Sequence, residues 1–383
     1  MATSASPDWG EIQSGFPVND HLIWLNNCGT TPLGNPIRKA VDLWLDEYQR
    51  RGSAAEGFSY VGVKASIYHR LQKLLGAQPG EFALMHHTAE GMNFISHGLA
   101  LRPGDEILLL ENEYPSNVYP WEHWREKGVG LRTVPMTERP GDFAAAFALA
   151  AGPKVKLASL SAVHWCTGMP LPLETIGRIC AERGITFVVD GSQGVGLVDL
   201  DVKACGIHYM AFSAWKWLLG PLGLGVLYVA QDRLEALKPV FKGTESVPQD
   251  NEYLPYKQGW KPTADRFVVS TGSMTDWIYF DASLAFLEGI GFARARGRIR
   301  ELAHRLSDGL RTAGFRLASD GFPGLETGIV AASRAGLDPG RAVLALKERN
   351  IIAANRLGRI RFAPHVYNSE SQIDQAIEAM ARL

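Results

Sequence analysis

From about residue 62 onward, the chain alternates short apolar runs with segments of helical periodicity. Several runs are apolar at consecutive positions, such as 107–110 and 187–189, which is typical of strands buried on both faces. Because helical crossovers cover both faces of a parallel sheet, this alternation predicts an α/β fold with a mainly parallel sheet. The seven expected strands are 81–85, 106–110, 131–135, 155–160, 186–190, 209–213 and 225–229.

The pattern changes after a proline-containing segment without clear periodicity at 238–266. A helical segment follows at 274–314. Short strands are then expected at 315–318, 328–332, 351–354 and 359–363, before a last helix at 372–383. This mixture predicts a large α/β domain at 25–270, and a small α+β domain formed by 271–383 and completed by the N-terminal residues 1–24.

Charge and cysteine content limit the classes of function. The 383 residues include 39 Lys and Arg against 40 Asp and Glu, so neither nucleic acid nor an anionic membrane is an expected partner. Residues 1–13 do not resemble a secretory signal, and no apolar run approaches the roughly 18 residues of a membrane span. The four cysteines match neither a disulfide framework nor a metal site. We expect a cytoplasmic protein without a bound metal.

Functional residues of parallel α/β sheets follow the carboxyl ends of the strands. Asp190 ends one expected strand and precedes a Gly-Ser-Gln-Gly turn, although an aspartate there is also typical of a helix N-cap. Lys216 follows another strand and lies between Trp215 and Trp217. Burial would lower its pKa and give a nucleophilic amine, whereas a surface lysine would only rest its stem on these neighbours.

Two further segments follow strand ends. Residues 86–91, His-His-Thr-Ala-Glu-Gly, lead into a helix expected from about Met92, where backbone amides can bind a phosphate. Tyr114 can stack on a flat ring or simply pack. Each feature alone is ambiguous, but together they offer phosphate donors, a ring partner, a carboxylate and a lysine. Pyridoxal phosphate (PLP) needs these four groups, so the combination predicts PLP as the cofactor.

From about Leu25 to Ile377, the sequence resembles the class V aminotransferase or cysteine desulfurase-like branch of fold-type I PLP enzymes. This branch includes selenocysteine lyases, kynureninases and isopenicillin N epimerase-like proteins. The most specific segments are FVVDGSQGVG at 187–196 and SAWKWLLGPLG at 213–223, and the 26-residue spacing from Asp190 to Lys216 matches the family. The resemblance implies that the large domain binds PLP on a seven-stranded sheet.

The resemblance also implies roles for individual residues. Lys216 would be the catalytic Schiff-base lysine and proton shuttle, Asp190 would pair with the pyridine nitrogen, and Arg361 would bind the substrate α-carboxylate. The other implied cofactor contacts are Thr88, Ala89, Tyr114, Trp165, Gln193, Ser213, Trp215 and Thr271. Tyr114 would stack on the ring and Gln193 would contact its phenolic oxygen. Because Thr271 matches a loop that reaches the partner's phosphate, a homodimer with a shared site is expected.

The departures from the family pattern concern the substrate. Cysteine desulfurases carry a nucleophilic cysteine shortly before the position of Arg361, but residues 351–359 contain none. Trp165 replaces an asparagine that many relatives use against the phenolic oxygen. Cys28, His164 and Cys166 are expected near the substrate, although a cysteine at such a position is also typical of ordinary packing.

The preferred reaction is β-elimination from a cysteine-derived α-amino acid, through an external aldimine and a Cα carbanion, without a catalytic-loop cysteine. A class V aminotransferase and an amino-acid epimerase are the enzymatic alternatives. A binding protein that has lost catalysis is the non-enzymatic alternative, and the joint presence of Lys216, Asp190 and Arg361 argues against it. A nucleotide-binding dehydrogenase is not supported, because no expected strand leads into a GxGxxG helix start.

Overall fold

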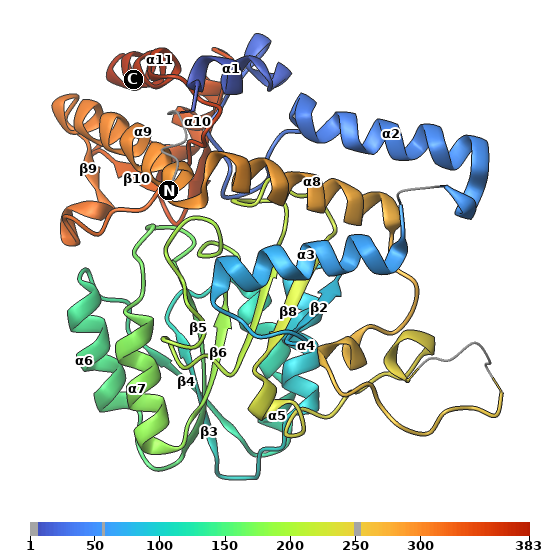
Figure 1. Cartoon of the computed structure of the whole chain (residues 1–383). Coiled ribbons are helices and arrows are strands. Elements are labelled where there is room, and N and C mark those ends of the chain that lie inside the picture. The colour runs from blue at the N-terminus through green and yellow to red at the C-terminus, as the bar shows by residue number, and fades with distance from the viewer. Residues whose placement is uncertain (1–6, 56–57, 249–253) are drawn as a thin grey trace, which may run out of the picture.

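The computed structural model describes residues 7–55, 58–248 and 254–383. Its main sheet has seven strands in the order β2-β8-β7-β6-β5-β3-β4 (Figure 1). Only β8 runs antiparallel to its neighbours, so the predicted mainly parallel sheet is confirmed. The strands are β2 (Phe82–Met85), β3 (Glu106–Leu110), β4 (Gly130–Val134), β5 (Val155–Ser161), β6 (Thr186–Asp190), β7 (Tyr209–Ser213) and β8 (Gly225–Val229).

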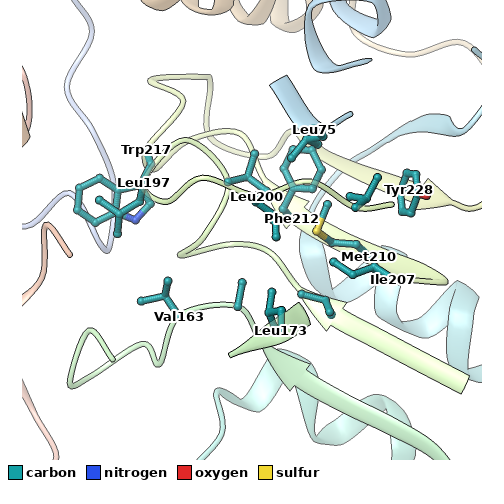
Figure 2. Close-up of a cluster of buried hydrophobic side chains, with 14 of the residues drawn as sticks. Leu75, Val163, Leu173, Leu197, Leu200, Ile207, Met210, Phe212, Trp217 and Tyr228 are labelled. Atoms are coloured by element: carbon teal, nitrogen blue, oxygen red, sulfur yellow. The ribbon is translucent and has the colours of Figure 1, made fainter. Parts of the chain in front are cut away.

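Helices cover both faces of this sheet. In β3, Leu108 and Leu110 point into one apolar core, and Ile107 and Leu109 point into the other. This alternation explains why the strands are apolar at consecutive positions. The first core includes residues of α3 (Tyr60–Leu75), α6 (Pro140–Ala150), α7 (Leu173–Arg183) and α8 (Met274–Ile290), and Figure 2 shows part of it. The second includes residues of α4 (Thr88–Gly98) and α5 (His123–Glu126).

A four-stranded antiparallel sheet, in the order β12-β13-β10-β9, lies in the C-terminal part of the chain. Its strands are β9 (Arg316–Leu317), β10 (Val330–Ser333), β12 (Ala354–Arg356) and β13 (Arg359–Phe362). A separate two-stranded sheet pairs β1 (Ile23–Trp24) with β11 (Ile351–Ile352). Ile23 of β1 belongs to an apolar cluster with C-terminal residues, and the small domain itself stays a prediction. The boundary near 270 stays a prediction.

The sequence-based element bounds were wrong in two places here. The expected strand at 351–354 is split, because β11 pairs with β1 whereas Ala354 already pairs with β13. The expected helix at 274–314 is two helices, α8 and α9 (Phe292–Thr312). Gly291 separates them with a φ of 89°, which breaks the helical path.

The remaining helices of more than one turn lie near the two ends of the described chain (Figure 1). They are α1 (Trp9–Ser14), α2 (Asn35–Arg51), α10 (Pro339–Lys347) and α11 (Glu370–Ala381). Within the described ranges, no helix combines the length and apolar character needed to cross a membrane.

Candidate active site

A cavity of about 360 Å³ brings most of the predicted site residues together. It is lined by Cys28, Gly29, His87, Thr88, Ala89, Tyr114, Ser116, Trp165, Ser192, Gln193, Trp215, Lys216, Arg356 and Arg361. Many of these follow strands β2, β3, β5, β6 and β7, because the carboxyl ends of parallel strands meet at one edge of the sheet. Four predicted residues are not part of this lining: Asp190, Ser213, His164 and Thr271.

Lys216 follows β7 and is buried, with a relative exposure of 9%. Burial lowers the pKa of its ammonium, and the charge of Asp190 partly opposes this effect. Its Nζ lies 5.5 Å from the ring centroid of Tyr114. In the part of the chain that the structure describes, Nζ forms neither a hydrogen bond nor an ion pair, so no such bond has to break before this amine reacts.

Asp190 is the last residue of β6 and is buried just outside the cavity lining. One of its carboxylate oxygens accepts a hydrogen bond of 2.8 Å from the backbone N–H of Ser192. Burial raises the pKa of Asp190, while Lys216 lowers it. A cationic ring nitrogen bound here would compensate this buried carboxylate.

The cavity lining also includes the start of α4. This helix begins at Thr88, four residues before the predicted start, because the His87 side chain accepts from the Glu90 N–H and caps it. The first two helical amides, those of Thr88 and Ala89, have no backbone acceptor among the described residues. These amides and the helix dipole favour an anion.

Two hydroxyl groups are relevant to a bound anion, one at the start of α4 and one on the last residue of β7. The Thr88 hydroxyl lies 2.8 Å from the Ser192 hydroxyl. The Ser213 hydroxyl is buried and has no hydrogen-bond partner within the described chain. Because buried polar groups are rarely left unpaired, the Ser213 hydroxyl marks a place where a ligand atom would bind.

The amide of Gln193 is already held by the protein. Its Nε2 donates to the Cys28 carbonyl at 3.0 Å, and its Oε1 accepts from the Trp217 indole at 2.9 Å. One N–H of Nε2 remains for a ligand. The Trp165 indole N–H donates to the Asn112 carbonyl at 2.8 Å, so a contact with the phenolic oxygen of PLP would require that bond to break. The cofactor role of Trp165 stays a prediction.

Arg361, on β13, projects into the cavity from the C-terminal sheet. Its Nη1 donates to the Trp165 carbonyl at 2.6 Å, and its Nη2 lies 3.5 Å from the Asn26 side-chain oxygen. Its Nε is buried without a partner among the described residues. The guanidinium is therefore oriented by the protein but still has a donor for a carboxylate.

The three remaining predicted residues, Cys28, His164 and Thr271, differ in their position relative to the cavity. Cys28 lines the cavity, and burial raises the pKa of its thiol although Arg361 and Lys216 lower it. His164 lies behind the lining, where its Nδ1 is 2.9 Å from the Thr167 hydroxyl and burial lowers its pKa to about 4. Thr271 lines a separate hollow together with Ser270 and Gly272.

Besides Gly29, His87, Ser116 and Ser192 of the cavity lining, sequence reasoning missed two further residues of this region. Glu113 is buried and accepts hydrogen bonds from Tyr114 N at 2.7 Å, Ser161 N at 2.8 Å, Ser161 Oγ at 2.5 Å and Asn117 Nδ2 at 3.2 Å. Burial and the nearby Asp190 raise its pKa to about 7. A glutamate directly before the predicted stacking aromatic was the available signal. The second residue is Arg356, which lines the cavity and follows no strand of the main sheet.

The residues present fit PLP. The unpaired Ser213 hydroxyl and the free amides of α4 suit its phosphate, and buried Asp190 suits its pyridine nitrogen. Lys216 has a desolvated amine without a protein partner in the described structure, as a covalent attachment point requires.

Comparison with known proteins also indicates a PLP enzyme. The family model described as aminotransferase class-V matches residues 23–370. Isopenicillin N epimerase of Amycolatopsis lactamdurans is 31% identical over 82% of this chain and 83% of its own length. A probable cysteine desulfurase of Pyrococcus abyssi is 27% identical, with 97% of each chain covered.

Solved structures share the fold. A C-DES mutant with glycine covalently linked to its PLP cofactor is 25% identical, with a TM-score of 0.90 and 98% and 99% of the two chains covered. The cystine C-S lyase C-DES, in complex with its product cysteine persulfide, is also 25% identical, with a TM-score of 0.89 and 96% and 99% covered. The match of the family model, together with the cavity around Lys216, shows that this chain belongs to the aminotransferase class-V family and is a PLP-dependent enzyme.

Proposed function

We propose that the enzyme cleaves the C–S bond of a cysteine-derived amino acid by β-elimination, without a persulfide relay. One observation carries this proposal. The described lining of the cavity contains the guanidinium groups of Arg356 and Arg361 and the amine of Lys216, but no carboxylate. A sulfur leaving group departs as an anion, and a cationic, partly desolvated cavity stabilises such a charge as it develops.

Each residue has a task in this reaction. PLP supplies an electron sink for the electron pair released at Cα. Arg361 holds the substrate α-carboxylate through Nε and its remaining N–H groups. Lys216, once its amine is free, removes the Cα proton, and its lowered pKa keeps enough of it in the neutral, basic form. Asp190 stabilises positive charge on the ring nitrogen.

The absence of a relay thiol follows from the hairpin before Arg361. Strands β12 and β13 are joined by only Leu357 and Gly358, and no cysteine lies between residues 351 and 359. Cys28 does line the cavity, but burial raises the pKa of its thiol, so the nucleophilic thiolate is disfavoured. The likeness to a cystine C-S lyase supports the same chemistry.

A product assay tests this proposal. The PLP-loaded enzyme should convert L-cystine or an S-substituted L-cysteine into equal amounts of pyruvate and ammonia, and Lys216→Ala should not. Cys28→Ser and Cys166→Ser should retain most of the activity. A keto acid formed without ammonia would identify an aminotransferase instead, and a complete loss of activity in Cys28→Ser would contradict the thiol-independent route.

Epimerisation is a second candidate, because two isopenicillin N epimerases, from Amycolatopsis lactamdurans and Streptomyces clavuligerus, are 31% and 30% identical to this chain. An epimerase needs proton donors on both sides of Cα, and the Cys28 thiol is the available acid beside Lys216. Incubation in D₂O separates the candidates. Recovery of racemised, α-deuterated amino acid without pyruvate would identify an epimerase.

We also propose that the working unit is a homodimer in the cytoplasm. Thr271 does not reach the cavity of its own chain, which is consistent with a contact to the phosphate of a partner. A mixed dimer of Lys216→Ala and Thr271→Ala subunits should then regain one intact site. The four cysteines are buried and unpaired, as is usual in a reducing compartment.

A further inference from the structure

The hairpin β12–β13 places three arginines on one face. Arg356 lies opposite Arg359, and Ala354 lies opposite Arg361. Residues opposite each other in an antiparallel pair point to the same side, as do residues two apart on one strand. Arg356, Arg359 and Arg361 therefore share a face, and small Ala354 leaves room beside Arg361.

This cluster of like charges has no acidic partner among the residues that the structure describes. Among the described residues, none of the three arginines forms a salt bridge, and Arg356 donates only to the carbonyl of its neighbour Asn355 at 2.7 Å. Elsewhere, arginines such as Arg305 and Arg311 pair with aspartates. Like charges directly opposite each other destabilise a strand pair. An anion bound beside the hairpin would remove this repulsion.

Two of the three arginines line the catalytic cavity. Arg361 is held by the Trp165 carbonyl, and we have assigned it to the substrate α-carboxylate. Arg356 is exposed at the edge of the same cavity and has no such anchor. The phosphate donors at the start of α4 follow β2 of the main sheet, whereas Arg356 is on β12 of the C-terminal sheet, so Arg356 is not needed for the phosphate. Arg356 thus lines the same cavity as Arg361 and has no assigned substrate group.

We propose that Arg356 is a specificity residue that binds a carboxylate at the end of the substrate side chain. Arg356 and Arg361 are diagonal neighbours, which places their backbones about 7 to 8 Å apart. An amino acid with a second carboxylate a few bonds beyond Cα would fit this spacing. This inference rests on the proposed function in one respect, namely that the substrate side chain contains a C–S bond.

Two substrates of nearly equal shape test the role of Arg356. S-carboxymethyl-L-cysteine carries the second carboxylate, and S-carbamoylmethyl-L-cysteine is its neutral analogue. The PLP-loaded enzyme should prefer the acid in kcat/KM by roughly tenfold to hundredfold, mainly through KM. Arg356→Gln should abolish this preference, because it should lower kcat/KM for the acid far more than kcat/KM for the neutral analogue. Arg359→Gln, which removes the same charge from the same hairpin outside this cavity, should retain it.

A charge reversal excludes a merely structural effect. Arg356→Glu should prefer S-aminoethyl-L-cysteine, whose side chain ends in an ammonium group, over S-carboxymethyl-L-cysteine. An unchanged preference for the acid in Arg356→Gln, or equal losses in Arg356→Gln and Arg359→Gln, would overturn the proposal.

A binding measurement separates this inference from the proposed reaction. Glutarate carries two carboxylates and cannot react, and its monomethyl ester carries one. By calorimetry, the holoenzyme should bind glutarate more tightly than the ester, and Arg356→Gln should bind both equally. If Arg356→Gln removes the preference for glutarate but the enzyme eliminates no cysteine derivative, the role of Arg356 is supported and the lyase reaction is rejected. Equal binding of both probes by the unmodified enzyme would reject the role of Arg356.

Discussion

Replacing Glu113 with glutamine should change how the stability of the protein depends on pH. Glu113 is 7% exposed, and burial and the charge of Asp190 raise its pKa from 4.5 to about 7. The native state therefore holds its proton at pH values where the unfolded chain has already lost it. The carboxyl contributes full stability below pH 4.5, and this contribution is lost as pH rises to about 7. The shift corresponds to about 3 kcal/mol.

The assay is denaturant unfolding of the cofactor-free protein and of Glu113→Gln at several pH values from 4.5 to 8. Buried His164, His208 and His365, whose pKa values are lowered to about 4, give stability an opposite pH dependence in part of this range. They are present in both proteins, so only the difference in unfolding free energy isolates Glu113. The unfolding free energy of the unmodified protein should exceed that of the variant most at pH 4.5. This difference should fall by about 3 kcal/mol by pH 7.

Glutamine is a strict test because it keeps the shape of the side chain. It cannot accept from all four donors, so the variant should also loosen Tyr114, whose N–H bonds to Glu113 at 2.7 Å. A difference in unfolding free energy that stays constant across this pH range would refute the reasoning, because it would show that Glu113 is ionised at the same pH in both states.

Three further predictions concern the site and its support. Asp190→Asn should retain the fold but lower kcat by roughly a hundredfold, because the ring nitrogen loses its buried counter-charge, and kinetics with PLP-loaded enzyme will show this. Arg361→Lys should raise KM for amino-acid substrates roughly tenfold, more than it lowers kcat, since lysine keeps the charge but loses the planar fork; steady-state kinetics would contradict this if only kcat changed. Gly177→Ala places a Cβ at 2.0 Å from the backbone oxygen of Cys205 and should destabilise the protein by about 1 to 3 kcal/mol in thermal unfolding. Gly141→Ala, in open space on α6, is its control and should not destabilise it.

The sheet and the residues at its strand ends were predictable because they depend on local patterns. Consecutive apolar residues in β3 and β6 reflect burial on both faces. Asp190 ends β6, and Lys216 lies three residues after the end of β7. All seven strands of the main sheet were predicted to within one residue at each end. Family resemblance then supplied roles that the pattern alone left ambiguous.

The missed features depend on side-chain contacts and on strand register, which the sequence pattern does not specify. The buried state of Glu113 follows from Ser161, which lies 48 residues away. The orientation of Arg356 follows from the register of a two-residue hairpin turn, whereas the sequence indicated only an extended segment. His164 turns away from the cavity because its ring bonds to Thr167 within the same loop. Residue spacing alone contains none of this information.

The most direct test of the account is to locate the covalent attachment of PLP. The loaded enzyme should show an imine absorbance at about 410 to 430 nm. Borohydride reduction, proteolysis and mass spectrometry should then find the pyridoxyl group on Lys216, and Lys216→Ala should show neither the band nor the adduct. A pyridoxyl group on another lysine of the unmodified enzyme, or no adduct at all, would contradict the assignment of this cavity as the active site.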